Sequence, residues 1–361
     1  MRNAIIKVWR GESKSLKWFL YPLLFPLSCA YEICLYVRNI VYRSGLVEIC
    51  KVPIPVISIG NITLGGTGKT PVVGRVSERL RRAGLNPAII TRGYKRKRKG
   101  TFLVDRDNDS AVDVGDEALM LSKKTRLPVF VGANRAQAIM KGIDAYPIDI
   151  ALLDDGFQLR NLYKDIEILL IDCSEKNNTS LFPLGPFRER AKRIKDADII
   201  LTRNGSISGL FSKYAEGVPA FSFRYRPMYL CNLRHDLTGH YNFLKEKNVL
   251  AFSGLGNNKS FFDLLKDLGA NVVHEVSYPD HYLYKNSDIK TLSGYHDADI
   301  IVTTEKDATK INQSSAPENL YYLTVEVEIE NEDAMIETIM DKLSVVRKDV
   351  LERYDGEIFY N

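Results

Sequence analysis

The stretch Val56–Pro71, VISIGNITLGGTGKTP, carries the most informative pattern in this sequence of 361 residues. An apolar run typical of a buried strand leads into a glycine-rich turn, and a helical pattern begins after Lys69. The core of the turn matches the phosphate-loop pattern GxxxxGK[ST], except that Thr63 stands where the first glycine is usual. Such a loop turns successive backbone N–H groups around phosphate oxygens at a helix N-terminus. We therefore predict nucleotide binding by the loop residues Thr63, Leu64, Gly65, Gly66, Thr67, Gly68, Lys69 and Thr70.

A second strand pattern supplies acidic partners for this loop. In such loops the lysine, here Lys69, reaches the β- and γ-phosphates, and the hydroxyl that follows, here Thr70, ligates Mg²⁺. The apolar run 148–153 ends in Asp154 and Asp155. Because ligands of open α/β sheets bind at the carboxyl ends of the strands, both acids are candidate metal ligands. The pattern predicts a nucleotide–Mg²⁺ site.

Short β-branched runs alternate with helical stretches after residue 51, which predicts a parallel sheet with helices on both faces. Strands are expected near 52–59, 87–91, 128–131, 148–153, 167–171 and 199–202. A similar rhythm follows from about residue 220, with strands near 249–252, 271–276, 299–302 and 320–325. We therefore expect an N-terminal segment (1–50), a phosphate-loop kinase domain (51–215) and a smaller second α/β domain that completes the active site (216–361).

Composition excludes several other classes of protein. Apolar residues make up 45% and charged residues 26%, which excludes disorder, collagen and a coiled coil as the main architecture. The five cysteines are scattered and lack CxxC spacing, so a disulfide framework or a zinc site is not expected. The net charge of +5 equals that of residues 1–51, which hold eight basic and three acidic residues. The net charge of the rest of the chain is therefore zero. Because the excess of positive charge is confined to the N-terminal segment, no nucleic-acid partner is predicted.

The N-terminal segment is aromatic, apolar and flanked by cations. Its stretch Trp18–Val37 contains two prolines and Glu32, and it shows neither the short apolar core nor the cleavage site of a signal peptide. A helix in the interface of a membrane with anionic lipid is the favoured interpretation. Packing on the protein's own domain and a true membrane span are the alternatives.

Seven motifs in order distinguish the chain from other phosphate-loop proteins. They are Asn61 with GGTGKTP, RGY (92–94), GDE (115–117), DDGFQ (154–158), PLGPFRE (183–189), PDHY (279–282) and TEKDA (304–308). This series resembles the tetraacyldisaccharide 4'-kinase family of Gram-negative bacteria, from the aromatic N-terminus to about residue 310. The resemblance implies a phosphate-loop kinase on the cytoplasmic face of the inner membrane. Such an enzyme transfers the γ-phosphate of ATP to the 4'-hydroxyl of a tetraacylated glucosamine disaccharide 1-phosphate, in lipid A biosynthesis.

The resemblance also implies roles in catalysis. It makes Asp116 the base that accepts the hydroxyl proton, with His281 orienting or polarising it, and it leaves Glu117 as a further Mg²⁺ ligand. Without the resemblance, Asp116 would be interpreted as a helix N-cap, and His281 as a loop histidine with a structural hydrogen bond.

The acceptor carries a 1-phosphate, so cations and hydrogen-bond donors are expected on its side of the site. Asn61, Arg92, Tyr94 and Arg188 are the candidate substrate-binding residues, and Lys95–Lys99 is a candidate membrane or lipid-phosphate contact. The segment Thr304–Asp307 fits either a purine-reading element, because guanine-specific loops use a Lys-x-Asp pattern, or packing between domains near the nucleotide.

Three positions depart from the family pattern. Leu159 stands where a histidine is usual, Lys95 follows RGY in place of glycine, and Tyr282 replaces a second histidine. Two other functions remain as alternatives: a nucleotide-driven chaperone or switch at the membrane without a lipid acceptor, and a membrane scaffold that only senses nucleotide.

Overall fold

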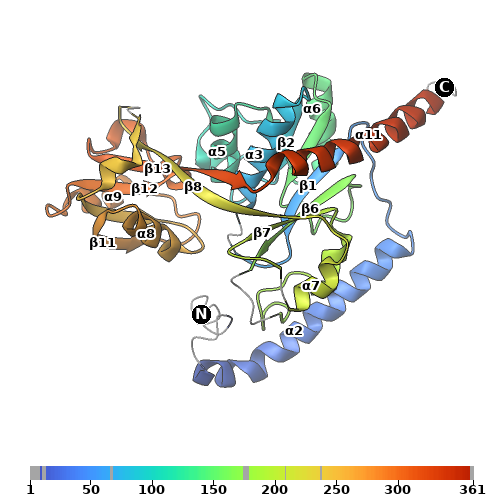
Figure 1. Cartoon of the computed structure of the whole chain (residues 1–361), viewed down its shortest axis with the longest axis horizontal. Helices are drawn as coiled ribbons and strands as arrows, with labels where there is room; N and C mark the ends of the chain where they lie inside the picture. Colours follow the sequence, from blue (N-terminus) through green and yellow to red (C-terminus); the bar gives the residue numbers. More distant parts are fainter. Residues whose placement is uncertain are drawn as a thin grey trace. The chain divides into compact units, whose positions relative to one another are not determined.

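The computed structural model describes residue 9 and residues 14–65, 68–173, 179–207, 209–235 and 238–357. The chain forms two compact units (Figure 1). Unit 1 comprises residues 1–90, 135–224 and 329–361, and unit 2 comprises residues 91–134 and 225–328. Residues 91–134, which we assigned to the first domain from the sequence, pack with the second unit.

Unit 1 is built on a parallel sheet with the order β8-β7-β6-β1-β5-β2. Its strands are β1 (Val56–Asn61), β2 (Pro87–Thr91), β5 (Ile150–Asp154), β6 (Ile166–Asp172), β7 (Ile199–Arg203) and the first part of β8 (Ala220–Asn232). Every residue of β1, β2 and β5 is buried, as expected for strands that are covered on both faces. Ile59 of β1 lies opposite Asp154 of β5, so the phosphate loop and the acidic pair leave the sheet side by side.

The helices of unit 1 cover this sheet. They are α2 (Lys14–Arg43), α3 (Lys69–Arg82), α6 (Arg135–Ala145), α7 (Leu210–Ala215) and α11 (Glu332–Glu357), with the 3₁₀ helix η1 (Ala191–Asp196). Arg75 of α3 donates two hydrogen bonds of 2.6 Å to Glu332, which ties α3 to α11. A hydrophobic cluster joins Leu35 of α2, Phe157, Phe187 and Phe211 of α7.

Helix α2 runs through both of its prolines, Pro22 and Pro26. Its docked face is tied to residues 181–190 by hydrogen bonds and ion pairs. Ser28 donates to the Leu181 carbonyl (3.0 Å), and Arg38 binds both oxygens of the buried Glu189 carboxylate (2.8 and 3.0 Å). The opposite face exposes large apolar side chains, among them Trp18, Phe19, Leu23, Leu27, Ile33, Tyr36, Val37 and Ile40. The part Trp18–Arg43 is long and apolar enough to cross a membrane, judged by length and composition alone.

Unit 2 contains a second parallel sheet with the order β11-β10-β12-β13. Its strands are β10 (Asn248–Ser253), β11 (Asn271–Ser277), β12 (Ile300–Thr304) and β13 (Leu320–Ile329), and the second part of β8 pairs with β9 (Thr238–His240). Successive residues of β10 serve opposite faces: Val249 and Ala251 pack toward α8 (Asn258–Asp267), whereas Leu250 and Phe252 pack toward α9 (Asn286–Ser293).

Residues 91–134 add a helical and an antiparallel part to unit 2. They form β3 (Phe102–Leu103), α4 (Ala111–Val114), α5 (Asp116–Thr125) and β4 (Val129–Val131). Helix α5 packs on the short helix α10 (Glu305–Ala308), and Lys124 binds the Glu305 carboxylate at 2.7 Å. This packing places the GDE motif beside the TEKDA motif within one unit.

Candidate active site

The glycine-rich loop lies between β1 and α3, as the order of elements in the sequence predicts. Gly65 and Gly68 have φ angles of 136° and 87°, conformations that side-chain-bearing residues rarely adopt, and Gly68 directly precedes α3. Gly66 and Thr67 lie outside the described residues. The Lys69 ammonium donates to Asn61 Oδ1 (3.3 Å) and lies 3.7 Å from Asp155 Oδ1. The loop thus presents its lysine at the end of β1.

The PLGPFRE segment supports the phosphate loop from the side. Leu64 N donates to the Pro186 carbonyl and Arg188 N to the Ile62 carbonyl, both at 2.7 Å. The Arg188 guanidinium donates to both Asp155 oxygens (3.0 and 3.1 Å). Four predicted site residues therefore form one cluster: Asn61, Lys69, Asp155 and Arg188.

Asp155 is the acidic centre of this cluster. Burial opposes its ionisation, but the charges of Lys69 and Arg188 outweigh burial and lower the pKa of the Asp155 carboxyl. The carboxylate therefore stays ionised and holds the two cations beside the loop.

The residues around Thr70 fit a magnesium ion that is shared with phosphate. The Thr70 hydroxyl donates to Asp154 Oδ2 at 3.4 Å, and both side chains are buried. Mg²⁺ prefers oxygen ligands and is commonly held by one or two carboxylates together with substrate phosphates. Among the described residues, no group of three or more His, Cys, Asp and Glu side chains could form an all-protein metal site. Thr70 and Asp154 match the shared arrangement.

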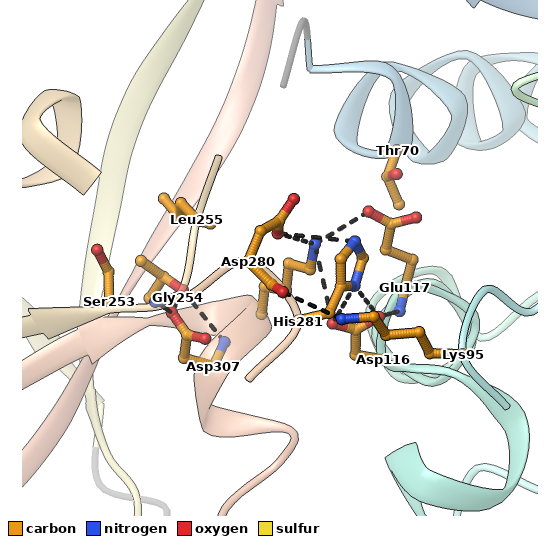
Figure 2. A network of polar contacts seen from close by, with 12 residues as sticks. Thr70, Lys95, Asp116, Glu117, Ser253, Gly254, Leu255, Asp280, His281 and Asp307 are labelled. Atoms are coloured by element: carbon orange, nitrogen blue, oxygen red, sulfur yellow. Dashed lines mark hydrogen bonds and ion pairs between the residues drawn. The ribbon is translucent and has the colours of Figure 1, made fainter. Parts of the chain in front are cut away.

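The residues proposed for proton transfer meet in unit 2. Asp116 is the first residue of α5, and His281 follows β11 in the PDHY motif. The His281 Nδ1 atom lies 2.8 and 3.0 Å from the two Asp116 oxygens, and both side chains are largely buried (Figure 2). The Tyr94 ring packs against the His281 ring with centroids 4.9 Å apart. The carboxylate–imidazole pair expected from the sequence is therefore formed.

A close approach of backbones places Asp116. Gly115 has φ 96°, and a Cβ atom there would lie 3.2 Å from both Gly93 Cα and the Tyr94 carbonyl oxygen. Glycine at 115 lets the RGY and GDE motifs lie against each other, so Tyr94 and Asp116 reach the same site.

Two lysines of the TEKDA region surround the dyad. Lys306 Nζ lies 3.1 Å from Glu117, 3.4 Å from Asp280 and 3.8 Å from Asp116. Lys310 is fully buried, pairs with Asp307 at 2.5 Å and lies 3.9 Å from Asp116 Oδ2.

These charges set the ionisation of the dyad. Burial raises the pKa of Asp116, but the His281 hydrogen bond and the charges of Lys306 and Lys310 outweigh it and lower the pKa to about 2. Burial also opposes the charge of Lys306, but Glu117 and the neighbouring acids outweigh it and raise the lysine's pKa. Asp116 is thus a carboxylate and Lys306 an ammonium at neutral pH.

The geometry argues against purine reading by Thr304–Asp307. Asp307 accepts hydrogen bonds from Gly254 N (2.9 Å) and the Thr304 hydroxyl (2.8 Å), and it is fully buried. Lys306 and Asp307 are also adjacent, so the segment lacks the spacing of a Lys-x-Asp pattern, and both charged side chains are directed to other residues of unit 2.

The remaining candidates lie on exposed parts of unit 2. Arg92 and Tyr94 are exposed, and their roles as substrate contacts stay a prediction. The run 95–99 is divided: Arg96 and Arg98 lie over the Phe102 ring, at 5.2 and 4.1 Å from its centroid. Lys95 donates to the Asp280 carbonyl at 3.4 Å. Three of the five side chains of this run therefore contact other residues of unit 2.

Comparison with known proteins identifies the family. The profile of the tetraacyldisaccharide-1-P 4'-kinases (LpxK) matches residues 20–344. Relatives named tetraacyldisaccharide 4'-kinase include those of Vibrio campbellii (34% identical, 94% of this chain and 97% of the relative) and Shewanella frigidimarina (34%, 92% and 93%). A crystal structure of LpxK from Aquifex aeolicus in complex with ATP superimposes with a TM-score of 0.74 at 32% identity, and it covers 91% of this chain and 99% of that one. The chain belongs to the tetraacyldisaccharide-1-phosphate 4'-kinase family.

Membership of this kinase family confirms the resemblance, the α/β fold and the assignment as a kinase of lipid A biosynthesis. Sequence reasoning missed three charged residues around the dyad: Asp280, Lys306 and Lys310. Asp280 and Lys306 lie inside the PDHY and TEKDA motifs, but we interpreted the lysine and aspartate of TEKDA as a purine-reading pattern, although the two residues are adjacent.

Proposed function

We propose that the chain transfers the γ-phosphate of ATP to the 4'-hydroxyl of a tetraacylated glucosamine disaccharide 1-phosphate. The bond between the γ-phosphorus and the β,γ-bridging oxygen breaks, a bond from phosphorus to the sugar oxygen forms, and ADP leaves. The proton of the sugar hydroxyl passes to Asp116. The observation that supports this most is the Asp116–His281 pair at 2.8 Å, because it offers a base for the sugar hydroxyl, which a scaffold that only senses nucleotide does not require.

The residues of the phosphate loop bind and orient ATP in this proposal. Backbone N–H groups of residues 63–70 surround the phosphates, and Lys69 compensates the charge of the transferred group. Hydrogen bonds of Asn61 and Arg188 hold the side chains of Lys69 and Asp155 in place. Asn61 and Arg188 are also proposed contacts of the substrate phosphates, together with Arg92 and Tyr94.

Thr70 and Asp154 are the proposed ligands of Mg²⁺, with Asp155 and Glu117 as further candidates. When bound, the ion neutralises charge on the phosphate oxygens. Glu117 has Lys306 as its partner and Asp155 has two cations, so the hydroxyl–carboxylate pair fits the metal better.

Asp116 accepts the proton of the sugar hydroxyl as a carboxylate. Phosphoryl transfer passes through a loose transition state, and a weak base suffices when the proton leaves late. His281 holds the Asp116 carboxylate through Nδ1. Because both side chains are largely buried, little water reaches the hydrogen bond between them.

The exposed face of α2 is the proposed membrane contact, on the cytoplasmic face of the inner membrane. An interfacial helix fits better than a span, because Glu32 and Arg38 form ion pairs with Arg190 and Glu189 on the docked face. If α2 crossed the bilayer, Glu32 and Arg38 would lose these ion pairs and enter the membrane as unpaired charges. The lipid acceptor would then reach the enzyme from the surface on which α2 lies.

A single assay tests this function. The protein is incubated with γ-labelled ATP, Mg²⁺ and the acylated disaccharide 1-phosphate in detergent micelles, and the lipid phase is extracted. We expect label in the lipid and none with Lys69→Ala. Labelled inorganic phosphate without labelled lipid would support a nucleotide-driven switch. Nucleotide binding without turnover would support a scaffold.

A further inference from the structure

We propose that Lys306 is a positioning residue that acts through Asp116, an inference that rests on the proposed role of Asp116 as the base. Its ammonium holds the carboxylates of the dyad region in one arrangement, so that Asp116 presents a fixed oxygen to the acceptor hydroxyl.

Three carboxylates crowd the Lys306 ammonium. The side chains of Asp116, Glu117 and Asp280 all lie within 4 Å of its Nζ atom, and the lysine side chain is only 14% exposed (Figure 2 shows the three acids). Like charges at such distances repel, and partial burial strengthens the repulsion. One cation between them removes the repulsion and fixes their directions.

The backbone fixes where this ammonium lies. Thr304 caps α10 by accepting a hydrogen bond from Asp307 N (3.1 Å), and Asp307 in turn accepts one from Gly254 N (2.9 Å). Lys306 therefore projects from a helix that is locked to the end of β10. A side chain on a rigid element holds a site more precisely than one on a loop.

The neighbouring lysine cannot take over this role. Lys310 lies in the turn that follows α10, and its fully buried side chain pairs with Asp307 at 2.5 Å. It lies 3.9 Å from Asp116 and adds to the local positive charge. Lys306, by contrast, lies within 4 Å of Asp116, Glu117 and Asp280.

The test combines Lys306→Met with Asp116→Asn. We measure kcat and the KM values for ATP and for the lipid with the full-length enzyme. Lys306→Met is expected to lower kcat by about 10- to 100-fold with KM for ATP changed less than about twofold. In the Asp116→Asn background the same substitution is expected to cost less than about threefold, because residues that act through one group are not additive. Lys306→Arg, which keeps the charge, is expected to recover part of kcat.

The controls separate positioning from folding and from nucleotide reading. Lys266→Met removes a surface ion pair with Glu275 in the same unit and should leave kcat unchanged. If Lys306→Met does not fold, Lys306→Gln and Lys306→Arg supply the same comparison, with thermal unfolding measured for each.

Three results would overturn the proposal: an unchanged kcat for Lys306→Met, full additivity with Asp116→Asn, or a raised KM for ATP with kcat intact. A raised KM for ATP with unchanged kcat would support a role of Lys306 in reading the purine. An unchanged kcat for Asp116→Asn alone would instead refute the proposed base.

Discussion

Two residues with proposed roles hold unusual backbone conformations. Asp155 and His281 have φ angles of 57° and 59°, in the left-handed region. This region costs an ordinary residue about 1–2 kcal/mol, and it persists where the surroundings hold it in place. Arg188 binds the side chain of Asp155, and Asp116 binds that of His281. Each of the two clusters to which we assign chemistry thus contains one residue in this conformation, which also occurs at Lys95, Arg126, Asn204, Glu246 and Asn331.

Asp116, the proposed base, is the first residue for which we predict the effect of a substitution. Asp116→Asn keeps the shape of the side chain but removes its charge, so kcat should fall by roughly 10²–10⁴ with little change in KM for ATP. Initial rates of lipid phosphorylation at varied ATP concentration measure both constants. Asp113→Asn, an exposed N-terminal acid of α4, is the matched control. A variant at 116 with the parent's kcat would show that another group accepts the proton.

Gly60 determines how closely two elements approach at the end of β1. A Cβ atom there would lie 2.6 Å from Phe157 Cβ and 2.8 Å from Phe157 N, and Phe157 is fully buried. The DDGFQ turn can therefore lie against the strand that carries the phosphate loop only because residue 60 is glycine.

Gly60→Ala should push these elements apart. We expect a loss of stability of about 1–3 kcal/mol, typical of overpacking, and weaker ATP binding. Urea unfolding and calorimetric titration with ATP measure the two effects. Gly239→Ala is the control, because the nearest atom to its added Cβ lies 4.0 Å away. Equal stability of both variants would contradict this account.

A buried ion pair lies beneath the same turn. Lys164 and Glu167 pair with side-chain exposures of 8% and 12%, and Lys164 also donates to the Gly156 carbonyl at 3.3 Å. Burial raises the pKa of Glu167 and lowers that of Lys164, so desolvation opposes the charge of both groups.

Removing one partner of this ion pair should lower the free energy of unfolding more than replacing both partners with apolar residues. Lys164→Met leaves Glu167 buried without its cation and should destabilise unit 1 by about 3–5 kcal/mol. The double variant with Glu167→Met should recover most of this loss, because it removes both buried charges. Urea unfolding of the parent, both single variants and the double variant decides the matter. A double variant no more stable than Lys164→Met would show that the pair itself supplies the stability.

At the scale of the whole molecule, α2 gives the enzyme one exposed apolar surface. Trp18 and Phe19 are 85% and 81% exposed, although they are among the largest apolar side chains of the chain. The opposite face of the helix is docked on unit 1 through Ser28 and Arg38. An apolar face that its own protein leaves open marks a contact with a membrane or a partner.

Substituting this surface should weaken membrane binding without affecting folding. Trp18→Ser with Phe19→Ser should lower co-sedimentation with phosphatidylglycerol vesicles by about tenfold or more, because two aromatic side chains no longer enter the interface. Val345→Ser, an exposed apolar position on α11, is the control. Undiminished sedimentation of the double variant would place the membrane contact elsewhere.

The phosphate loop, the acidic strand end and the alternation of strands and helices could be predicted from the sequence alone. These are local properties: glycine spacing, a lysine next to a helix start and runs of β-branched residues act over a few positions, and most predicted strands agree with the structure within a few residues. The long strand β8 was missed because its residues alternate between buried and exposed without a clear period.

The pairing of charged side chains, in contrast, depends on how distant segments pack in the folded chain. Arg188 reaches Asp155 across 33 positions, and Lys306 reaches Glu117 across 189. Residues 91–134 pack with the second unit, which brings the GDE motif to the TEKDA motif. A charged side chain carries no local signal of its partner, because the pairing depends on the sheet order and helix packing that bring distant segments together.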